Sequence, residues 1–152
     1  YYSGFENSEV VIGLTGLVGT DLSEISNILR EIFSEFGYNA TTIRVSTDII
    51  DDLPNNFQKS IERREKNYEE MGCPKEENES EYNKYWRQMS WGDSLCRKTD
   101  DPGILGYAAS AKIKELRQPT EQEKTKAAWL ISSLKRPEEV MALKRVYNGG
   151  FY

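Results

Sequence analysis

The stretch that decides the fold is Val10–Phe36, V-V-I-G-L-T-G-L-V-G-T-D-L-S-E-I-S-N-I-L-R-E-I-F-S-E-F. Its first residues, Val10–Leu14, are apolar and rich in β-branched side chains, which predicts a buried strand. A glycine follows at every third position from Gly13 to Gly19, and a helical pattern that ends at Gly37 comes next. The apolar residues of that helix share one face: Leu22, Ile25, Ile28, Leu29, Ile32, Phe33 and Phe36.

This order of strand, glycine-rich turn and helix is typical of P-loop proteins, in which backbone N–H groups and a helix N-terminus face a phosphate. If Gly16 is the first glycine of G-x-x-x-x-G-K-[ST], the last three positions fall on Asp21, Leu22 and Ser23. The magnesium-binding hydroxyl is then kept as Ser23, whereas the lysine is replaced by leucine. Asp21 and Glu24 resemble a capping box, which would satisfy the helix's own N-terminal donors. The pattern predicts a P-loop scaffold, and a glycine-rich turn without a ligand is the alternative.

Composition restricts the class of protein. The 152 residues carry a net charge of −5, which argues against a generally basic nucleic-acid surface, and they suit one domain. No apolar run is long enough to span a membrane and no signal peptide is visible, so a cytoplasmic protein is expected. Cys73 and Cys96 lie in no metal-ligand spacing. The absence of histidine excludes Ser-His-Asp and Cys-His catalysis and histidine-based zinc sites.

Two further core strands are predicted, at Thr41–Ser46, which alternates and is β-branched, and at Ala127–Leu134, which is apolar. The first strand, its helix and Thr41–Ser46 form a βαβ unit with a parallel sheet. Asp48 follows the second strand, where ligands bind in open α/β sheets; it is either a ligand contact or the N-cap of a short helix. We therefore expect an α/β chain with a three-layer P-loop NTPase or nucleotide-kinase-like fold, a parallel sheet and helices on both faces.

The middle of the chain predicts helices and connections. A charged outer helix is expected over Asn55–Glu70, a loop over Met71–Ser80 and a polar connection over Gln118–Lys126. Between the last two, a helix from Glu81 to about Lys98 has an aromatic face that favours the core over a base-stacking surface: Tyr82, Tyr85, Trp86 and Met89.

Two later helices have clear starts. Asp101 is expected as the N-cap of an apolar, small-residue helix that runs to Leu116. Pro137 and the glutamates after it suit a helix N-terminus, and Asn148–Gly150 ends that helix. Three of its residues are expected to point inward: Val140, Leu143 and Val146.

The last two residues, Phe151 and Tyr152, suit the start of a fourth strand beside Leu130–Leu134. A chain that stops at this point would leave a sheet edge unpaired, a condition that favours association. We therefore expect the 152-residue chain to self-associate, or to be less stable than a chain extended by one strand and helix.

Three strand ends are expected to converge on one crevice: Gly16–Ser23, Arg44–Asp48 and Ser132–Arg136. Candidate nucleotide- or phosphate-binding residues there are Gly16, Gly19, Thr20, Ser23, Lys135 and Arg136, with Arg44, Asp48 and Arg97 as secondary candidates. Serines stand where an NTPase places the acid that holds the water around Mg²⁺. No catalytic or metal-binding residue is therefore predicted, Mg²⁺ is doubtful, and the ligand is ATP, GTP or a deoxynucleotide if the crevice holds one.

Three segments resemble the bacterial anti-phage deoxycytidylate deaminases, which act on dCTP or dCMP. Gly13–Leu22, G-L-T-G-L-V-G-T-D-L, looks like their degenerate P-loop. Tyr85–Arg97, Y-W-R-Q-M-S-W-G-D-S-L-C-R, resembles a helix of that family through Met89, Gly92, Leu95 and Arg97, with Asp93 in place of asparagine. The most specific match is Ser133–Tyr147, S-L-K-R-P-E-E-V-M-A-L-K-R-V-Y, followed by Gly150–Tyr152.

The resemblance implies a nucleotide-kinase-like P-loop domain that is regulatory or sensory and is joined in that family to a C-terminal zinc deaminase. Zinc deaminases need H-x-E and P-C-x-x-C, which this chain lacks. The chain, residues 1–152, is therefore expected to be the N-terminal domain, with the deaminase and its zinc downstream, or a version of that domain that works beside a separate effector. Implied partners are the deaminase domain or neighbouring protomers in a homo-oligomer, a nucleotide and an inhibitory small RNA, without a membrane.

Two other functions stay open. One is an active nucleoside or nucleotide kinase, or an NTPase, that uses Lys135 or Arg136 in place of the missing lysine. The other is an RNA- or partner-binding regulatory module that uses the P-loop only as a scaffold. Nucleotide turnover would select the first, and RNA binding with a steep salt dependence would select the second.

Overall fold

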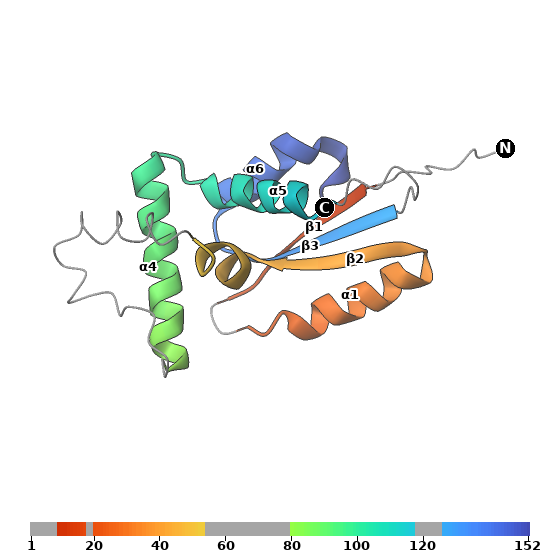
Figure 1. Cartoon of the computed structure of the whole chain (residues 1–152), viewed down its shortest axis with the longest axis horizontal. Helices are drawn as coiled ribbons and strands as arrows, with labels where there is room; N and C mark the ends of the chain where they lie inside the picture. Colours follow the sequence, from red (N-terminus) through yellow and green to blue (C-terminus); the bar gives the residue numbers. More distant parts are fainter. Residues whose placement is uncertain (1–8, 18–19, 54–79, 118–125) are drawn as a thin grey trace.

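The computed structural model describes residues 9–17, 20–53, 80–117 and 126–152. Their three strands form a parallel sheet in the order β1-β3-β2: β1 is Glu9–Thr15, β2 is Tyr38–Arg44 and β3 is Lys126–Leu134. Helix α1 (Ser23–Glu35) lies on one face of the sheet, and helices α5 (Ile104–Leu116) and α6 (Pro137–Tyr147) lie on the other (Figure 1). The predicted α/β class, with a parallel sheet covered on both faces, is confirmed. The expected outer helix over 55–70, the loop over 71–79 and the connection over 118–125 lie outside the described residues.

Strand β3 is the centre of the sheet, and its sequence suits that place. It is apolar from Ala127 to Ile131, as expected for a strand that is buried on both faces. Val11 of β1 pairs with Trp129 on one side, and Ile43 of β2 pairs with Ile131 on the other. These four side chains belong to one buried apolar cluster, which forms the core between the sheet and helices α5 and α6.

The second strand ends earlier than predicted. Its last residue is Arg44, and a π-helical turn, η1 (Val45–Ile50), follows in place of the expected strand residues Val45 and Ser46. The cause is local, because the Asp48 carboxylate (Oδ2) accepts the backbone N–H of Arg44 at 2.8 Å. The helical turn begins at Val45, so Asp48 lies within it and is not its N-cap as predicted; its carboxylate instead accepts the N–H of the N-cap residue Arg44.

The connections leave β1 and β3 in opposite directions. From β1, helix α1 (Ser23–Glu35) crosses one face to β2, passing over β3. From β3, helix α6 (Pro137–Tyr147) and a 3₁₀ turn, η2 (Asn148–Gly150), return on the other face to β1. Adjacent strands whose connections diverge leave a crevice at their carboxyl ends, where ligands bind in α/β sheets.

Phe151 forms an isolated parallel bridge to the sheet, but the neighbour predicted for Phe151 and Tyr152 was wrong. Phe151 bridges to Val11 of β1 in parallel, with a hydrogen bond of 2.9 Å from the N–H of Tyr152 to the Val11 carbonyl. The predicted place beside Leu130–Leu134 is taken, because β3 already has β1 on one edge and β2 on the other. The pair therefore extends the sheet at the outer edge of β1.

Helix α1 buries less of its apolar face than predicted. Leu22 and Ser26 are buried and Leu29 and Phe33 are half-buried on the sheet side, where the ring of Phe33 contacts Tyr38 edge-on. A second apolar row next to it is exposed by 44 to 69%: Ile25, Ile28, Ile32 and Phe36. A helix on a flat sheet buries one narrow stripe, so a wider apolar face is left partly in solvent.

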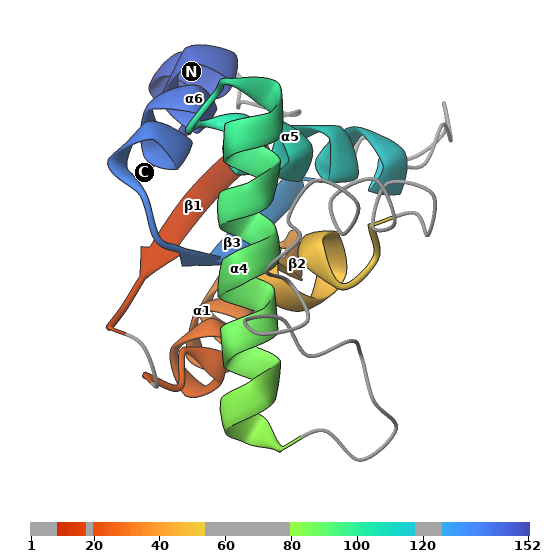
Figure 2. The same cartoon turned by 90° about the vertical axis from the view of Figure 1, so that its left-hand side faces the viewer.

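Helix α4 (Glu81–Thr99) stands across the carboxyl ends of the strands (Figures 1 and 2). Its C-terminal half packs into the core through Trp91 and Leu95. The aromatic face of its N-terminal half was predicted to be core and is not, because that half extends past the sheet: Tyr82, Tyr85, Trp86 and Met89 are 41 to 71% exposed. Although α4 is 19 residues long, none of the described helices combines the length and apolar character needed to cross a membrane.

Helices α5 (Ile104–Leu116) and α6 pack closely at two glycines. The N-cap of α5 is Gly103 rather than the predicted Asp101, whose carboxylate instead accepts the Gly103 N–H at 2.8 Å. A Cβ on Gly106 would lie 2.4 Å from the Glu139 carbonyl oxygen, so only glycine fits there. In α6, Leu143 is buried as predicted, whereas Val146 is exposed.

Candidate functional site

A cavity of about 730 Å³ lies at the carboxyl ends of the strands, where the connections from β1 and β3 diverge. Its size is in the range of small-molecule sites. All three predicted strand ends contribute to its wall, with Gly16 and Ser23 after β1, Arg44 at the end of β2 and Lys135 after β3. The predicted convergence is confirmed. Thr20 and Arg136 also line the cavity, whereas Gly19 lies outside the described residues.

The turn from β1 into α1 is capped by its own acid. The carboxylate of Asp21 (Oδ1) accepts the backbone N–H of Ser23 at 2.8 Å, and hydrogen bonding from Ser23 holds the pKa of Asp21 below its ordinary value. Asp21 is exposed and lines the cavity. A carboxylate therefore lies at the helix N-terminus where the P-loop pattern expects a phosphate. The predicted capping box of Asp21 and Glu24 was wrong, because the N-cap is Leu22 and Asp21 accepts the N–H of Ser23.

The turn from β3 into α6 is capped by a buried acid. Glu139, 1% exposed, accepts the backbone N–H groups of Lys135 at 2.8 Å and Arg136 at 3.3 Å. Burial raises the pKa of its carboxyl, against the opposing effect of those two hydrogen bonds. Ser133 has a φ of +68°, a left-handed conformation that costs a non-glycine residue energy and turns the chain sharply toward α6.

Lys135 connects the two turns. Its Nζ donates to the carbonyl oxygen of Gly16 at 3.3 Å, so the ammonium lies at the glycine turn although it comes from the other end of the chain. In a P-loop this charge comes from the lysine of the turn itself, which is Leu22 here and is buried. Lys135 is thus placed to meet an anion at the N-terminus of α1.

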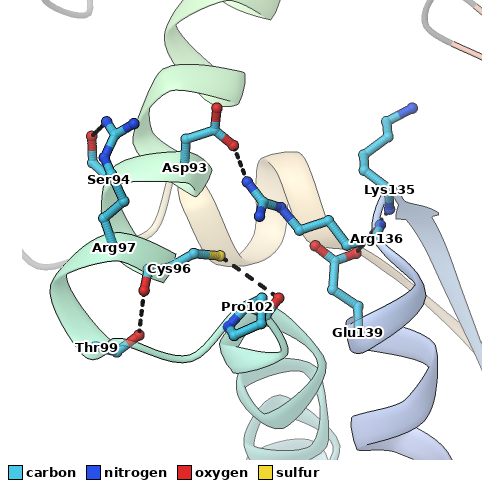
Figure 3. Close-up of polar contacts among 9 residues, drawn as sticks. All are labelled: Asp93, Ser94, Cys96, Arg97, Thr99, Pro102, Lys135, Arg136 and Glu139. Carbon is cyan, nitrogen blue, oxygen red and sulfur yellow. Dashed lines mark hydrogen bonds and ion pairs between the residues drawn. The ribbon is translucent and has the colours of Figure 1, made fainter.

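Helix α4 forms the far wall of the cavity. Tyr85, Gln88, Met89 and Gly92 line it, and Asp93 pairs with the guanidinium of Arg136 (Figure 3). Sequence reasoning missed this wall as part of the site, apart from the option that the aromatic face stacks a nucleobase. The available signal was the segment Tyr85–Arg97 itself, since Met89, Gly92 and Asp93 of that segment line the cavity.

Two secondary candidates are not cavity residues. Arg97 lies on the other side of α4 from Arg136 and donates to Ser94 at 3.3 Å (Figure 3). Asp48 is engaged by the backbone of Arg44 and by the hydroxyl of Thr47. Arg44, the third of them, does line the cavity and donates to the Ser23 hydroxyl at 2.5 Å. Arg44 therefore belongs to the site, whereas Arg97 and Asp48 do not.

Behind α4, a buried ion pair fixes the helix to η1. Arg87, 2% exposed, donates to Asp51 Oδ1 at 2.7 Å, and the amide of Gln88 donates to Asp51 Oδ2 at 2.9 Å. The guanidinium also lies over the ring of Trp91, 5.0 Å from its centre. These contacts position the wall of the cavity rather than take part in binding.

The charges that line the cavity are balanced, with Arg44, Lys135 and Arg136 against Asp21, Asp93 and Glu139. Within the described parts of the chain, no group of three acidic or cysteine side chains could hold a metal ion. The Cys96 thiol is buried, which raises its pKa, and it contacts the Pro102 carbonyl at 3.8 Å (Figure 3). The arrangement suits binding of an anionic ligand by cationic side chains and backbone N–H groups.

Comparison of the chain with protein-family models, with curated proteins and with solved structures gave no match.

Proposed function

We propose that this chain is a nucleotide-binding regulatory domain of P-loop, nucleotide-kinase-like ancestry, working beside a deoxycytidine-nucleotide deaminase in anti-phage defence. One observation carries the proposal. The three segments that resemble that deaminase family, Gly13–Leu22, Tyr85–Arg97 and Ser133–Tyr147, are far apart in the sequence and all contribute residues to one cavity. Two of these segments follow the parallel strands β1 and β3, and the third lies on α4, which crosses the carboxyl ends of the strands, so all three can contact one ligand.

The cavity lining is of two kinds. The N-terminus of α1, Lys135 and Arg44 offer positive charge to phosphate groups. Tyr85 and Met89 of α4 offer apolar surface for a nucleobase. A volume of about 730 Å³ accommodates a ligand of nucleotide size. A ligand in this cavity would contact α4 and both turns together, so it would link these elements to one another.

Two departures from the P-loop pattern argue against phosphoryl transfer by this chain alone. Leu22 replaces the P-loop lysine, and the strand end carries Ser132 and Ser133 in place of an acid. Single contacts that stabilise a transition state commonly supply about 3 to 4 kcal/mol, so the loss of two should slow transfer by several orders of magnitude. The domain is therefore proposed to bind without turnover.

An active kinase is the second candidate, because Lys135 places an ammonium at the glycine turn. The two candidates differ in a measurable rate. A kinase of ordinary efficiency turns over at about 1 to 100 per second. We expect hydrolysis of ATP or GTP, and phosphate transfer to deoxynucleosides, to stay at the level of a protein-free control.

Calorimetric titration with dCTP, dCMP, ATP and GTP tests the proposal. At least one should bind to the wild-type protein, and Lys135→Ala/Arg136→Ala should weaken that binding about tenfold or more, because it removes two charge-assisted contacts. The matched control is Arg30→Ala/Lys144→Ala, which removes the same charge from exposed sites on α1 and α6 and should bind like the wild type. Equal binding by a folded Lys135→Ala/Arg136→Ala protein, or binding of no nucleotide by the wild type, would overturn the proposal.

A further inference from the structure

The hydroxyl of Ser23 has a partner that the P-loop pattern does not expect. In that pattern the serine or threonine at this position binds Mg²⁺. Here the Ser23 Oγ accepts a hydrogen bond from Nη2 of Arg44 at 2.5 Å. A permanently charged guanidinium thus lies where the pattern expects a metal ion.

Two nearby carboxylates are also engaged by the protein. Asp21 accepts the Ser23 N–H, and Asp48 accepts the Arg44 N–H through one oxygen and the Thr47 hydroxyl, at 2.9 Å, through the other. Mg²⁺ needs a near-ideal octahedron of oxygens at about 2.0 to 2.1 Å, several of them from water. A dication bound to Ser23 would lie against the Arg44 guanidinium, and the two like charges repel. The residues of this site do not fit Mg²⁺.

Arg44 is held in this place by the backbone. It is the last residue of β2 and pairs with Ser132 of β3, and its N–H is bonded to Asp48. The guanidinium reaches the first turn of α1 and lines the cavity. Apart from the bond to Ser23, its N–H donors have no side-chain or backbone acceptor within the described ranges, so they are available to an anion.

We infer that Arg44 takes the place of the metal cation, so the site recognises a phosphate group that carries no Mg²⁺. This inference rests on the proposed function, and it specifies the form of the ligand. The bound species is a free phosphate ester or polyphosphate, whose oxygens accept from Arg44 and Lys135, rather than the magnesium chelate on which kinases act. Binding therefore does not require a divalent cation.

The test uses inorganic tripolyphosphate as the probe, titrated into the full chain by calorimetry with excess EDTA and again with millimolar Mg²⁺. We expect the affinity in EDTA to equal or exceed that in Mg²⁺, because the metal competes with the protein for the probe. Arg44→Gln should weaken binding about tenfold or more, since it removes the charge and keeps an N–H donor. Ser23→Ala should weaken the binding of tripolyphosphate less than Arg44→Gln does. Arg30→Gln is the control, because it removes the same charge from the exposed surface.

The outcomes separate this inference from the proposed function. Binding that appears only with Mg²⁺, or a larger loss for Ser23→Ala than for a folded Arg44→Gln, would leave the proposed function standing and overturn the inference. Selective broadening of the amide signals of residues 21–23 and 44–48 by Mn²⁺ alone would overturn it as well. If tripolyphosphate and the nucleotides bind under neither condition, both the proposed function and the inference fail. Recovery of binding by Arg44→Lys would support the role of the charge.

Discussion

Two turns in this molecule do the same structural task with different exposure. The described residues between β1 and α1, 16–17 and 20–22, and the turn from β3 into α6 both contribute to the same cavity. In each turn an acid accepts backbone N–H groups near the start of the helix. Asp21 is exposed and accepts one N–H, whereas Glu139 is buried and accepts two.

The difference separates a binding element from a supporting one. An exposed carboxylate at a helix N-terminus can be displaced by an anionic ligand, because water can replace the hydrogen bonds that the carboxylate makes. A buried carboxylate cannot leave without stranding two N–H groups. The turn after β3 is therefore a rigid support that holds Lys135 against the turn after β1, and the turn after β1 is the adaptable side.

The packing of α5 on α6, which supports the turn after β3, should be the feature most sensitive to substitution. Gly106→Ala would place a Cβ 2.4 Å from the Glu139 carbonyl oxygen, which forces α5 and α6 apart. We expect a loss of about 3 kcal/mol or more in the free energy of unfolding, measured by urea titration. Gly149→Ala is the control, because its Cβ would meet nothing within 4 Å. Equal stability of the two variants would mean that the helices separate at no cost.

The two capping acids should differ in stability. Glu139→Ala leaves the N–H groups of Lys135 and Arg136 without their acceptor and should cost about 2 to 3 kcal/mol in the free energy of unfolding. Asp21→Ala should shift the thermal midpoint only slightly, because its partner N–H can bond to water. If Asp21→Ala proves the more destabilising of the two, the contrast between the turns is wrong.

The contribution of Glu139 to the free energy of unfolding should fall as the pH rises, as expected for a buried acid. The folded-state pKa of Glu139 is raised, so between its unfolded and folded pKa values the folded state binds more protons. The stability contributed by this group therefore falls as pH rises above about 4.3, the ordinary pKa of glutamate. Comparing wild type with Glu139→Gln by urea unfolding across this range isolates the contribution. If the free energy of unfolding of the wild type instead rises relative to that of Glu139→Gln as the pH rises, the two hydrogen bonds outweigh burial.

The adaptable turn should respond in binding rather than in folding. Asp21→Asn removes a negative charge from the N-terminus of α1 and keeps an oxygen that can accept the Ser23 N–H. We expect tripolyphosphate to bind about two- to threefold more tightly, the modest effect of one exposed charge. Calorimetry at low and high salt checks it, since the gain should shrink with screening. Weaker binding would mean that Asp21 assists the ligand.

Much of the fold and the position of the candidate site could be predicted from the sequence, because both depend on local patterns. The apolar runs around Val11 and Leu130 predicted two strands, and Pro137 with the glutamates after it predicted the start of α6. Since parallel strands end at one edge, the convergence of three strand ends also followed. The candidate phosphate residues that the structure describes lie together for this reason.

The errors concern relations between elements. Which strand Phe151 joins depends on the order of the strands, and no local pattern encodes that order. The aromatic face of α4 has the same periodicity whether it meets a core or a cavity, so Tyr85 and Met89 were expected to be buried. The role of Arg44 required its distance to Ser23, which lies 21 residues earlier in the chain.

The most direct test of the central claim is an amide NMR titration of the ¹⁵N-labelled chain with dCTP, the nucleotide of the resembling family. If the cavity is a nucleotide site, saturable shifts should be concentrated in residues 16–17, 20–23, 44–46, 85–93 and 133–136, which contribute to its wall, with no product formed during the titration. If dCTP, dCMP, ATP and GTP all leave these signals unchanged, or if saturable shifts fall on another surface, the cavity is not a nucleotide site and the account is contradicted.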